Sequence, residues 1–180
     1  MLVTGGAGAV GFYAIQWARL GGARTVVATV SRAEQAEVAR AAGADAVVNY
    51  RTEPVADLVR EITGGGVDRI VEVAFGQNLA TAVHVIRPNG VIAAYSSDRV
   101  PEPVVPFWSL LAKDVTVRFV LVYEMPLAAH QAAADAITEA LEAGRLQHRI
   151  GARFPLADVA RAHEAQESGT LIGKAVIELA

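Results

Sequence analysis

The sequence contains no cysteine, no long apolar run and no excess of basic residues. Without cysteine, the chain can form neither a disulfide bond nor a thiolate site for zinc or an iron–sulfur cluster. The longest apolar runs, such as Phe119–Tyr123, fall far short of the roughly 18 residues that cross a bilayer. The formal net charge of −3 argues against a general nucleic-acid-binding protein, which usually carries a strong basic excess. We therefore expect neither membrane insertion nor nucleic-acid binding.

The N-terminal sequence also lacks the basic segment and apolar core that form a secretory signal, so we expect a cytoplasmic protein. Apolar material, in contrast, is ample. Of the 180 residues, 53% are hydrophobic and 19% are charged. This composition excludes an intrinsically disordered chain, and the length predicts one domain, or one domain with an appendage.

Strand-like and helix-like segments alternate from residue 1 to about residue 122. Short β-branched or apolar runs predict strands at 2–4, 25–30, 46–48, 67–73, 91–95 and 115–122. Segments with helical spacing predict helices at 10–20, 33–42, 54–63, 79–86 and around 108–112. This alternation predicts an α/β fold of the Rossmann type, with a doubly wound parallel sheet of six strands and right-handed crossovers.

The C-terminal part departs from this alternation. A long Ala-rich helix at 128–142 precedes an extended segment at 147–154, a helix at 156–168 and a last strand at 174–179. We therefore predict a Rossmann domain over residues 1–145 and a C-terminal helix-strand tail over residues 146–180.

A glycine motif, G-x-G-x-x-G, follows the first predicted strand and opens the first predicted helix. This order of strand, glycines and helix is the context in which the motif binds a dinucleotide, because the glycines let the backbone approach the diphosphate closely. Free N–H groups and the positive end of the helix dipole then attract the phosphates. The alternative is a glycine-rich turn with a structural role alone. The residues expected to contact the cofactor here are Gly6, Gly8, Ala9, Val10 and Gly11.

The end of the second predicted strand indicates which dinucleotide binds. Proteins that bind NAD usually place Asp or Glu there, where it binds the ribose 2′-hydroxyl. This chain has Ser31 and Arg32 instead, which can donate a hydrogen bond to a 2′-phosphate and pair with its charge. We therefore expect NADP(H) as the cofactor; the alternative for Arg32 is a solvated charge at the start of a helix.

Two other classes share parts of this pattern. S-adenosylmethionine methyltransferases have the same fold and a glycine-rich first loop, but they normally need an acidic residue where Ser31 and Arg32 stand. Short-chain reductases need a Tyr-x-x-x-Lys pair. The residues four positions after the four tyrosines are Trp17, Pro54, Arg99 and Leu127, so this pair is missing.

Five segments of the chain together resemble one known family. They read LVTGGAGAVGFYAIQWARLGGARTVVATVS, GADAVVNYR, ITGGGVDRIVEVAFG, PNGVIAAYSS and AHEAQESGTLIGKAVI. They resemble the medium-chain dehydrogenase/reductases of the NADPH:quinone oxidoreductase (zeta-crystallin-like) subgroup, which lacks the catalytic zinc of alcohol dehydrogenases. The resemblance covers essentially the whole chain. It implies an NADPH-dependent oxidoreductase that transfers hydride to a quinone or an activated enone.

The resemblance also implies roles for residues outside the glycine motif. Tyr50, in the V-x-N-Y-R segment, would lie beside the adenosine 2′-phosphate, whereas Gln35 stands where relatives commonly have a lysine. Arg32 would substitute for that lysine. The residues expected to line the path of the ribose and nicotinamide are Ala74, Phe75 and Gly76 in the loop after the fourth strand, Tyr95 and Ser96 after the fifth, and Phe119, Val120 and Leu121 in the sixth.

Relatives begin with a GroES-like catalytic domain, whereas this chain starts at the first Rossmann strand. The resemblance therefore implies a cofactor domain alone, with a tail that in relatives packs on the other domain. The last strand, 175–179, would then lack its usual partner, and we expect a homodimer because an unpaired apolar strand favours association. No catalytic residue and no metal site is assigned. The alternative function is a non-catalytic dinucleotide-binding module or a truncated fragment.

Overall fold

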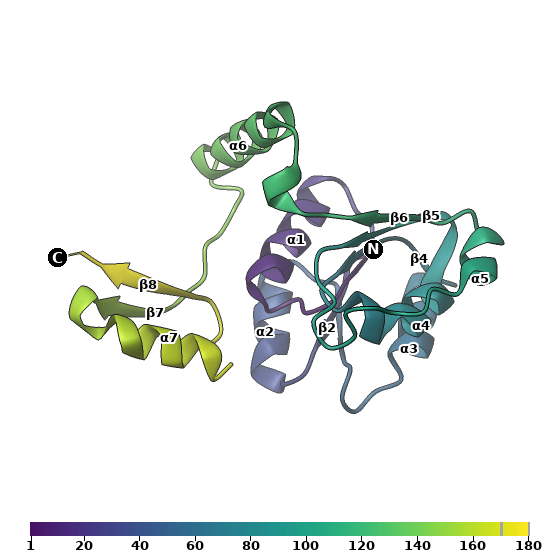
Figure 1. Ribbon diagram of the computed structural model, residues 1–180, viewed down its shortest axis with the longest axis horizontal. Coiled ribbons are helices and arrows are strands. Elements are labelled where there is room, and N and C mark those ends of the chain that lie inside the picture. Colours follow the sequence, from purple (N-terminus) through teal and green to yellow (C-terminus); the bar gives the residue numbers. More distant parts are fainter. Residues whose placement is uncertain (170, 180) are drawn as a thin grey trace.

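The structure, a computed structural model, describes residues 1–169 and 171–179. Its main body is a six-stranded sheet with helices on both faces (Figure 1). The strands are β1 (Leu2–Val3), β2 (Val27–Val30), β3 (Ala46–Asn49), β4 (Val67–Glu72), β5 (Ile86–Ala94) and β6 (Thr116–Phe119). The helices are α1 (Ala9–Leu20), α2 (Ala33–Ala41), α3 (Val55–Thr63), α4 (Phe75–Val85) and α5 (Phe107–Leu111).

The strands lie in the order β3-β2-β1-β4-β5-β6, and every neighbouring pair is parallel. The chain passes from β3, on one side of β1, to β4 on the other side, so the strand order reverses next to β1. Open α/β sheets bind ligands outside the carboxyl ends of the strands at such a switch point. The predicted doubly wound Rossmann-type sheet is therefore confirmed, and its switch point lies between β1 and β4.

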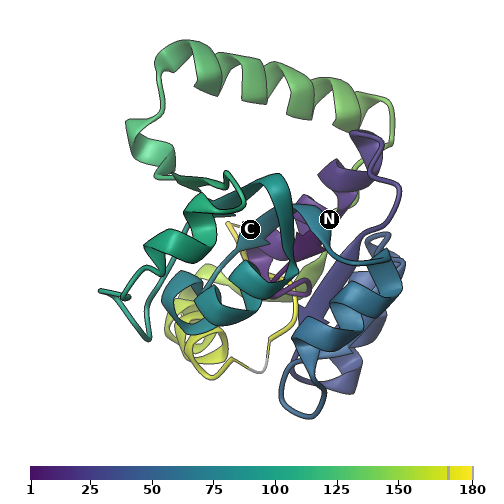
Figure 2. The same ribbon diagram turned by 90° about the vertical axis from the view of Figure 1, so that its right-hand side faces the viewer.

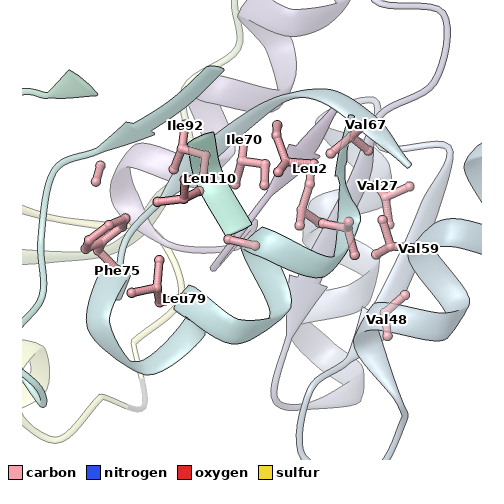
Figure 3. Close-up of a cluster of buried hydrophobic side chains, with 14 residues drawn as sticks. Leu2, Val27, Val48, Val59, Val67, Ile70, Phe75, Leu79, Ile92 and Leu110 are labelled. Carbon is pink, nitrogen blue, oxygen red and sulfur yellow. The ribbon is translucent and has the colours of Figure 1, made fainter. Parts of the chain in front are cut away.

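Two hydrophobic layers cover the two faces of the sheet. Leu2 and Val27 belong to the layer that contains side chains of α3 and α4, whereas Val3 and Ala28 belong to the layer under α1 and α2. Figure 3 shows the first layer, in which Leu2, Val27 and Leu79 of α4 share one cluster. Because successive strand residues point to opposite faces and both faces are buried, these strands appear in the sequence as continuous apolar runs.

Beyond β6 the chain leaves the sheet. The elements that follow are the 3-10 turn η1 (Val122–Glu124), α6 (Leu127–Glu142), β7 (Ile150–Pro155), η2 (Leu156–Asp158), α7 (Val159–Glu167) and β8 (Lys174–Glu178). Figures 1 and 2 show α6 apart from the sheet, and Ala140 is the one buried residue of this helix. Strands β7 and β8 pair in a separate two-stranded sheet that contacts α7.

The start of α4 differs from the prediction. A helix was expected at 79–86 and a loop at 74–76, but α4 begins at Phe75, and Ala74 is its N-cap. Phe75 is buried in the hydrophobic layer, and its N–H donates to the carbonyl oxygen of Ser96 (3.0 Å). Tertiary contacts with the β5 side therefore start this helix one turn early, which local periodicity does not reveal.

Two predictions about strands were also wrong. Strand β6 was expected to reach residue 122 but ends at Phe119, because the chain turns into η1 before Pro126. Val120 and Leu121 therefore lie just beyond the strand. The last strand was expected to lack its usual partner and to stay unpaired, but β8 pairs along its length with β7.

No helix in the described part of the chain is both long enough and apolar enough to cross a membrane.

Candidate functional site

The loop between β1 and α1 lies at the switch point of the sheet. Gly5 adopts a positive φ of 65°, which favours glycine and turns the chain back toward α1. Its N–H donates to Oγ1 of Thr29 (3.2 Å), and the N–H of Gly6 donates to the carbonyl oxygen of Thr29 (2.9 Å). The carboxyl end of β2 therefore holds this loop in place.

The glycines of the motif have different roles in this loop. A Cβ atom on Gly11 would lie 2.2 Å from the carbonyl oxygen of Gly5, and one on Gly6 would lie 2.7 Å from Cβ of Ala28. Only glycine lets α1 and β2 approach the loop this closely, so Gly6 and Gly11 serve the packing of the loop. Gly8 instead lines an open hollow in front of the helix.

The first turn of α1 has unused hydrogen-bond donors. Within the described residues, the N–H groups of Ala9, Val10 and Gly11 have no acceptor, and the N-cap, Gly8, has no side chain to supply one. The first turn contains no acidic residue. These donors lie at the positive end of a 12-residue helix, which is a favourable position for a phosphate group.

A hollow of about 310 Å³, here called the glycine-loop hollow, lies in front of this turn. It brings together six of the predicted site residues, from the motif, from the ends of β2 and β3, and from the end of β5. None of the described residues that line it is charged. Its lining consists of Gly5, Ala7, Gly8, Ala9, Val10, Thr29, Val30, Ser31, Gln35, Tyr50, Val73 and Tyr95.

The end of β2 differs from the sequence prediction. Arg32 does not line the hollow, because its guanidinium donates to the carbonyl oxygen of Gly169 in the tail (2.9 Å). Ser31 lies in the hollow, but both its N–H and its hydroxyl donate to Oε1 of Gln35 (2.9 Å each). The expected pairing of Arg32 with a 2′-phosphate therefore has no support in this arrangement, which leaves uncharged Ser31, Gln35 and Tyr50 at this end.

A second hollow, of about 520 Å³, lies at the ends of β5 and β6 and is here called the apolar hollow. Phe75 and Phe119 meet edge to face in it, with ring centroids 5.4 Å apart. Six predicted site residues come together here, and no described residue of the lining is charged. The lining consists of Phe75, Ala94, Tyr95, Ser96, Ser97, Pro101, Pro103, Val105, Phe119, Val120 and Leu121. Tyr95 belongs to both hollows.

Ala74 lies in neither hollow but in a third one, of about 470 Å³, on the side of α3 and α4. Buried Glu72 holds Ala74 there: Oε1 of Glu72 accepts hydrogen bonds from the N–H of Ala74 (2.6 Å), the hydroxyl of Thr4 (2.9 Å) and the side-chain amide of Asn78 (2.8 Å). Glu72 is thus a buried polar residue that ties the end of β1 to the start of α4. Its second oxygen, Oε2, has no partner in the described part of the chain.

The tail supplies two cations that the sequence analysis missed. Arg149 and Lys174 line a small hollow together with Gly8 and Ala9 of the glycine motif. The N–H of Lys174 donates to the carbonyl oxygen of Arg149 (2.9 Å), which keeps the two residues side by side. Their sequence distance from the motif exceeds a hundred residues, and no local pattern marks them.

Two contacts attach this part of the tail to α1. The N–H of Gln147 donates to Oε1 of Gln16 (2.7 Å), and Nε2 of Gln16 donates to the carbonyl oxygen of Gln147 (3.2 Å). The hydroxyl of Tyr13 lies 2.7 Å from Nδ1 of His148. Gln16 is buried, so these contacts hold the start of the tail firmly beside the helix whose N-terminus faces Arg149 and Lys174.

Comparison with known proteins assigns the chain to a family. The family of zinc-binding dehydrogenases matches residues 9–140, which include the second half of the glycine motif and most of both hollows. The chain belongs to the zinc-binding dehydrogenase family. A 2-haloacrylate reductase from a Burkholderia species is 33% identical over 187 residues, a match that covers 98% of this chain and 54% of that protein. A quinone oxidoreductase from Pseudomonas aeruginosa is 31% identical over 181 residues, with 98% and 55% covered.

Solved structures of this dehydrogenase family agree. Mycobacterial Rv1454c complexed with NADPH superposes with a TM-score of 0.85 at 29% identity, covering 98% of this chain and 55% of that one. A 2-haloacrylate reductase structure gives a TM-score of 0.87 at 31% identity, with 99% and 57% covered. The expected membership of the medium-chain dehydrogenase/reductases, in the part that carries the cofactor fold, is confirmed. The chain spans about half the length of the curated relatives it matches.

The zinc in the name of this dehydrogenase family has no counterpart in the described residues. Among them, no group of three or more His, Cys, Asp or Glu side chains lies close enough together to hold a metal ion. The residues present therefore do not fit a zinc site, and the function proposed below uses none.

Proposed function

We propose that this chain is the cofactor domain of an NADPH-dependent oxidoreductase that passes hydride to a quinone or an activated enone. The observation that carries the proposal is the junction of the glycine-loop hollow and the apolar hollow at Tyr95. A dinucleotide whose diphosphate lies at the helix N-terminus has its adenosine end toward β2 and its nicotinamide end toward β5. Bound in this way, NADPH supplies a hydride from its nicotinamide ring.

The residues of the chain bind and orient this cofactor. The free N–H groups of Ala9, Val10 and Gly11 face the diphosphate, and Arg149 and Lys174 add positive charge beside the same turn. At the other end, Ser31, Gln35 and Tyr50 surround the adenosine ribose with uncharged donors and acceptors. Structural support for the cofactor is thus strongest at the diphosphate.

The lining of the apolar hollow supports an uncharged acceptor. Its described residues are aromatic and aliphatic side chains, prolines and two serines, without a cation. A carboxylate acceptor, such as a haloacrylate, would lose its hydration in this hollow without gaining an ion-pair partner. This desolvation costs several kcal/mol. A planar quinone or enone would instead contact the exposed ring of Phe119 and the aliphatic side chains around it. This argument for a quinone over an acid concerns the part of the acceptor site that this chain contributes.

A two-step assay tests the proposed function. The chain is titrated with NADPH by fluorescence, and the absorbance of NADPH is then followed after addition of 1,4-naphthoquinone or 2-chloroacrylate. Saturable binding followed by quinone-dependent oxidation supports the proposal. Binding without oxidation by either acceptor favours the non-catalytic dinucleotide-binding module, and faster oxidation by 2-chloroacrylate contradicts the choice of acceptor.

The uncharged end of the glycine-loop hollow leads to a prediction about cofactor choice. Replacing Gln35 with lysine is expected to raise the preference for NADPH over NADH by about tenfold. A charge-assisted hydrogen bond to the 2′-phosphate contributes about 1.5–3 kcal/mol, and part of this gain is offset by the loss of the hydrogen bond between Ser31 and Gln35. Dissociation constants of both cofactors, measured by fluorescence, give this ratio.

The matched control is Ala33→Lys, which adds the same charge at an exposed position of α2 outside the hollow. This variant is expected to change the ratio less than twofold, since an exposed lysine outside the hollow stays hydrated and contributes little to an ion pair. An equal change in both variants would show that Gln35 does not face the adenosine ribose.

The homodimer remains part of the proposal, although its expected cause has changed. Strand β8 is paired, whereas β6 lies at the edge of the main sheet and carries exposed Phe119. An exposed edge strand can pair with a second copy of the chain. Sedimentation of the chain with and without Phe119→Lys, at several concentrations, measures this association; a monomer at all concentrations would contradict it.

A further inference from the structure

Tyr95 occupies the boundary between the two hollows. It follows the last residue of β5, and its N–H donates to the carbonyl oxygen of Glu72 at the end of β4 (3.1 Å). This bond anchors its backbone between the two strand ends. Among the described residues that line the two hollows, Tyr95 is the one that they share.

The hydroxyl of Tyr95 is free to bind a ligand. Within the described part of the chain it has no hydrogen-bond partner, although the side chain is half-buried. The two other hydroxyl groups in the apolar hollow are already used. Ser96 donates to Oδ1 of Asp98 (2.8 Å), and Ser97 donates to the carbonyl oxygen of Val100 while accepting from the N–H of Gly76 (2.9 Å). Tyr95 therefore has the one unused hydroxyl among the described residues of that lining.

The protonation state of this hydroxyl is well defined. Burial, and to a smaller extent the negative charge of Glu72, raise the pKa of Tyr95 to about 12. The phenol is therefore neutral at physiological pH and presents an O–H donor. A neutral donor can bind a carbonyl oxygen, and it binds an oxyanion more strongly.

We propose that the Tyr95 hydroxyl donates a hydrogen bond to the carbonyl oxygen of the hydride acceptor. This inference rests on the proposed function and adds a residue role to it. When the acceptor takes up hydride, a C–H bond of the reduced nicotinamide would break, and the hydrogen and the electron pair of that bond would form a new C–H or O–H bond on the acceptor. Negative charge would then collect on the carbonyl oxygen at the other end of the acceptor's conjugated system. Tyr95 stabilises that oxyanion and keeps its own proton, and the oxyanion is then protonated by water. Hydrogen-bond donors placed in this way lower the activation free energy, because they stabilise the charge that develops in the transition state.

Labelling the tyrosines tests this proposal without relying on turnover. The chain is prepared with ¹³C at Cζ of tyrosine, and the Tyr95 resonance is assigned with Tyr95→Phe. NADP⁺ is added first, followed by 1,4-naphthoquinone, which the oxidised cofactor cannot reduce. The quinone is expected to shift the Tyr95 resonance and to leave that of Tyr123, an exposed residue outside both hollows, unchanged.

Binding measurements provide the second readout. Tyr95→Phe is expected to weaken binding of the quinone to the NADP⁺-loaded chain by about five- to tenfold, whereas Tyr123→Phe leaves it unchanged. Where turnover is measurable, Tyr95→Phe lowers kcat for the quinone by about ten- to a hundredfold with little change in the KM for NADPH.

The outcomes separate the two proposals. Failure of NADP⁺ to bind, measured by calorimetry, overturns the proposed function and the role of Tyr95 with it. If NADP⁺ binds but the quinone does not, or if the quinone binds without moving the Tyr95 resonance, the role of Tyr95 is overturned while the cofactor domain stands. Equal quinone affinity of the wild-type chain and Tyr95→Phe also overturns it.

Discussion

Replacing Gly11 with alanine is expected to lower the free energy of unfolding by about 3 kcal/mol or more and to abolish NADPH binding. The added Cβ would lie 2.2 Å from the carbonyl oxygen of Gly5 and 2.8 Å from its carbonyl carbon. Both atoms are backbone, so no side chain can move aside, and α1 must shift away from the loop. That shift also displaces the free N–H groups at the start of the helix. Urea denaturation measures the stability, and fluorescence titration measures the binding.

The matched control for this prediction is Gly144→Ala. Gly144 follows the end of α6 and has a φ of +65°. Apart from its chain neighbours, no atom lies within 4 Å of a Cβ added there. Alanine there is expected to lower the free energy of unfolding by about 1–2 kcal/mol, because it must adopt the left-handed backbone conformation. NADPH binding is expected to persist. Equal losses in the two variants, or retained NADPH binding in Gly11→Ala, would contradict the packing role of Gly11.

The double variant Arg149→Gln, Lys174→Gln is expected to weaken NADPH binding by about a hundredfold. Both residues line the small hollow shared with Gly8 and Ala9, beside the positive end of α1, and Nε of Arg149 also donates to the carbonyl oxygen of Ile172 (3.3 Å). Charge-assisted hydrogen bonds to a phosphate contribute about 1.5–3 kcal/mol each, and two partly exposed ones together give an effect of this size. Glutamine retains most of the side-chain length and removes the charge. Titration at two salt concentrations measures the affinity and its salt dependence, which is expected to fall in the variant.

Arg161→Gln is the control for the loss of positive charge. Arg161 pairs with Asp158 on the surface of the tail and lines none of the hollows described above. This variant is expected to bind NADPH as the unmodified chain does. If the double variant keeps its affinity, the tail lies beside the glycine motif without taking part in cofactor binding.

The fold could be predicted from the sequence because its signals are local. Each buried strand is a short apolar run, each helix has its own periodicity, and the glycine motif joins one strand to one helix over six residues. The handedness of the crossovers then decides which face of the sheet each helix covers. The same local logic placed Gly8, Ala9 and Val10 at the site, and the structure brings them to the glycine-loop hollow.

The residues that sequence reasoning missed or misplaced depend on contacts between distant segments. Arg32 has the right position in the chain to bind a 2′-phosphate, but its guanidinium reaches Gly169 in the tail instead. Arg149 and Lys174 lie beside the glycine motif in a tail that Gln147 and His148 attach to α1. Long flexible cations are directed by the nearest acceptor in space, and sequence spacing carries no information about an acceptor more than a hundred residues away.

The central claim is that the glycine-loop hollow binds NADPH, and calorimetric titration of the chain tests it most directly. NADPH, NADH and S-adenosylmethionine are titrated in turn under the same conditions. We expect saturable binding of one NADPH per chain, weaker or similar binding of NADH because Ser31, Gln35 and Tyr50 are uncharged, and no binding of S-adenosylmethionine. Binding of S-adenosylmethionine in place of NADPH, or binding of none of the three, would contradict the account.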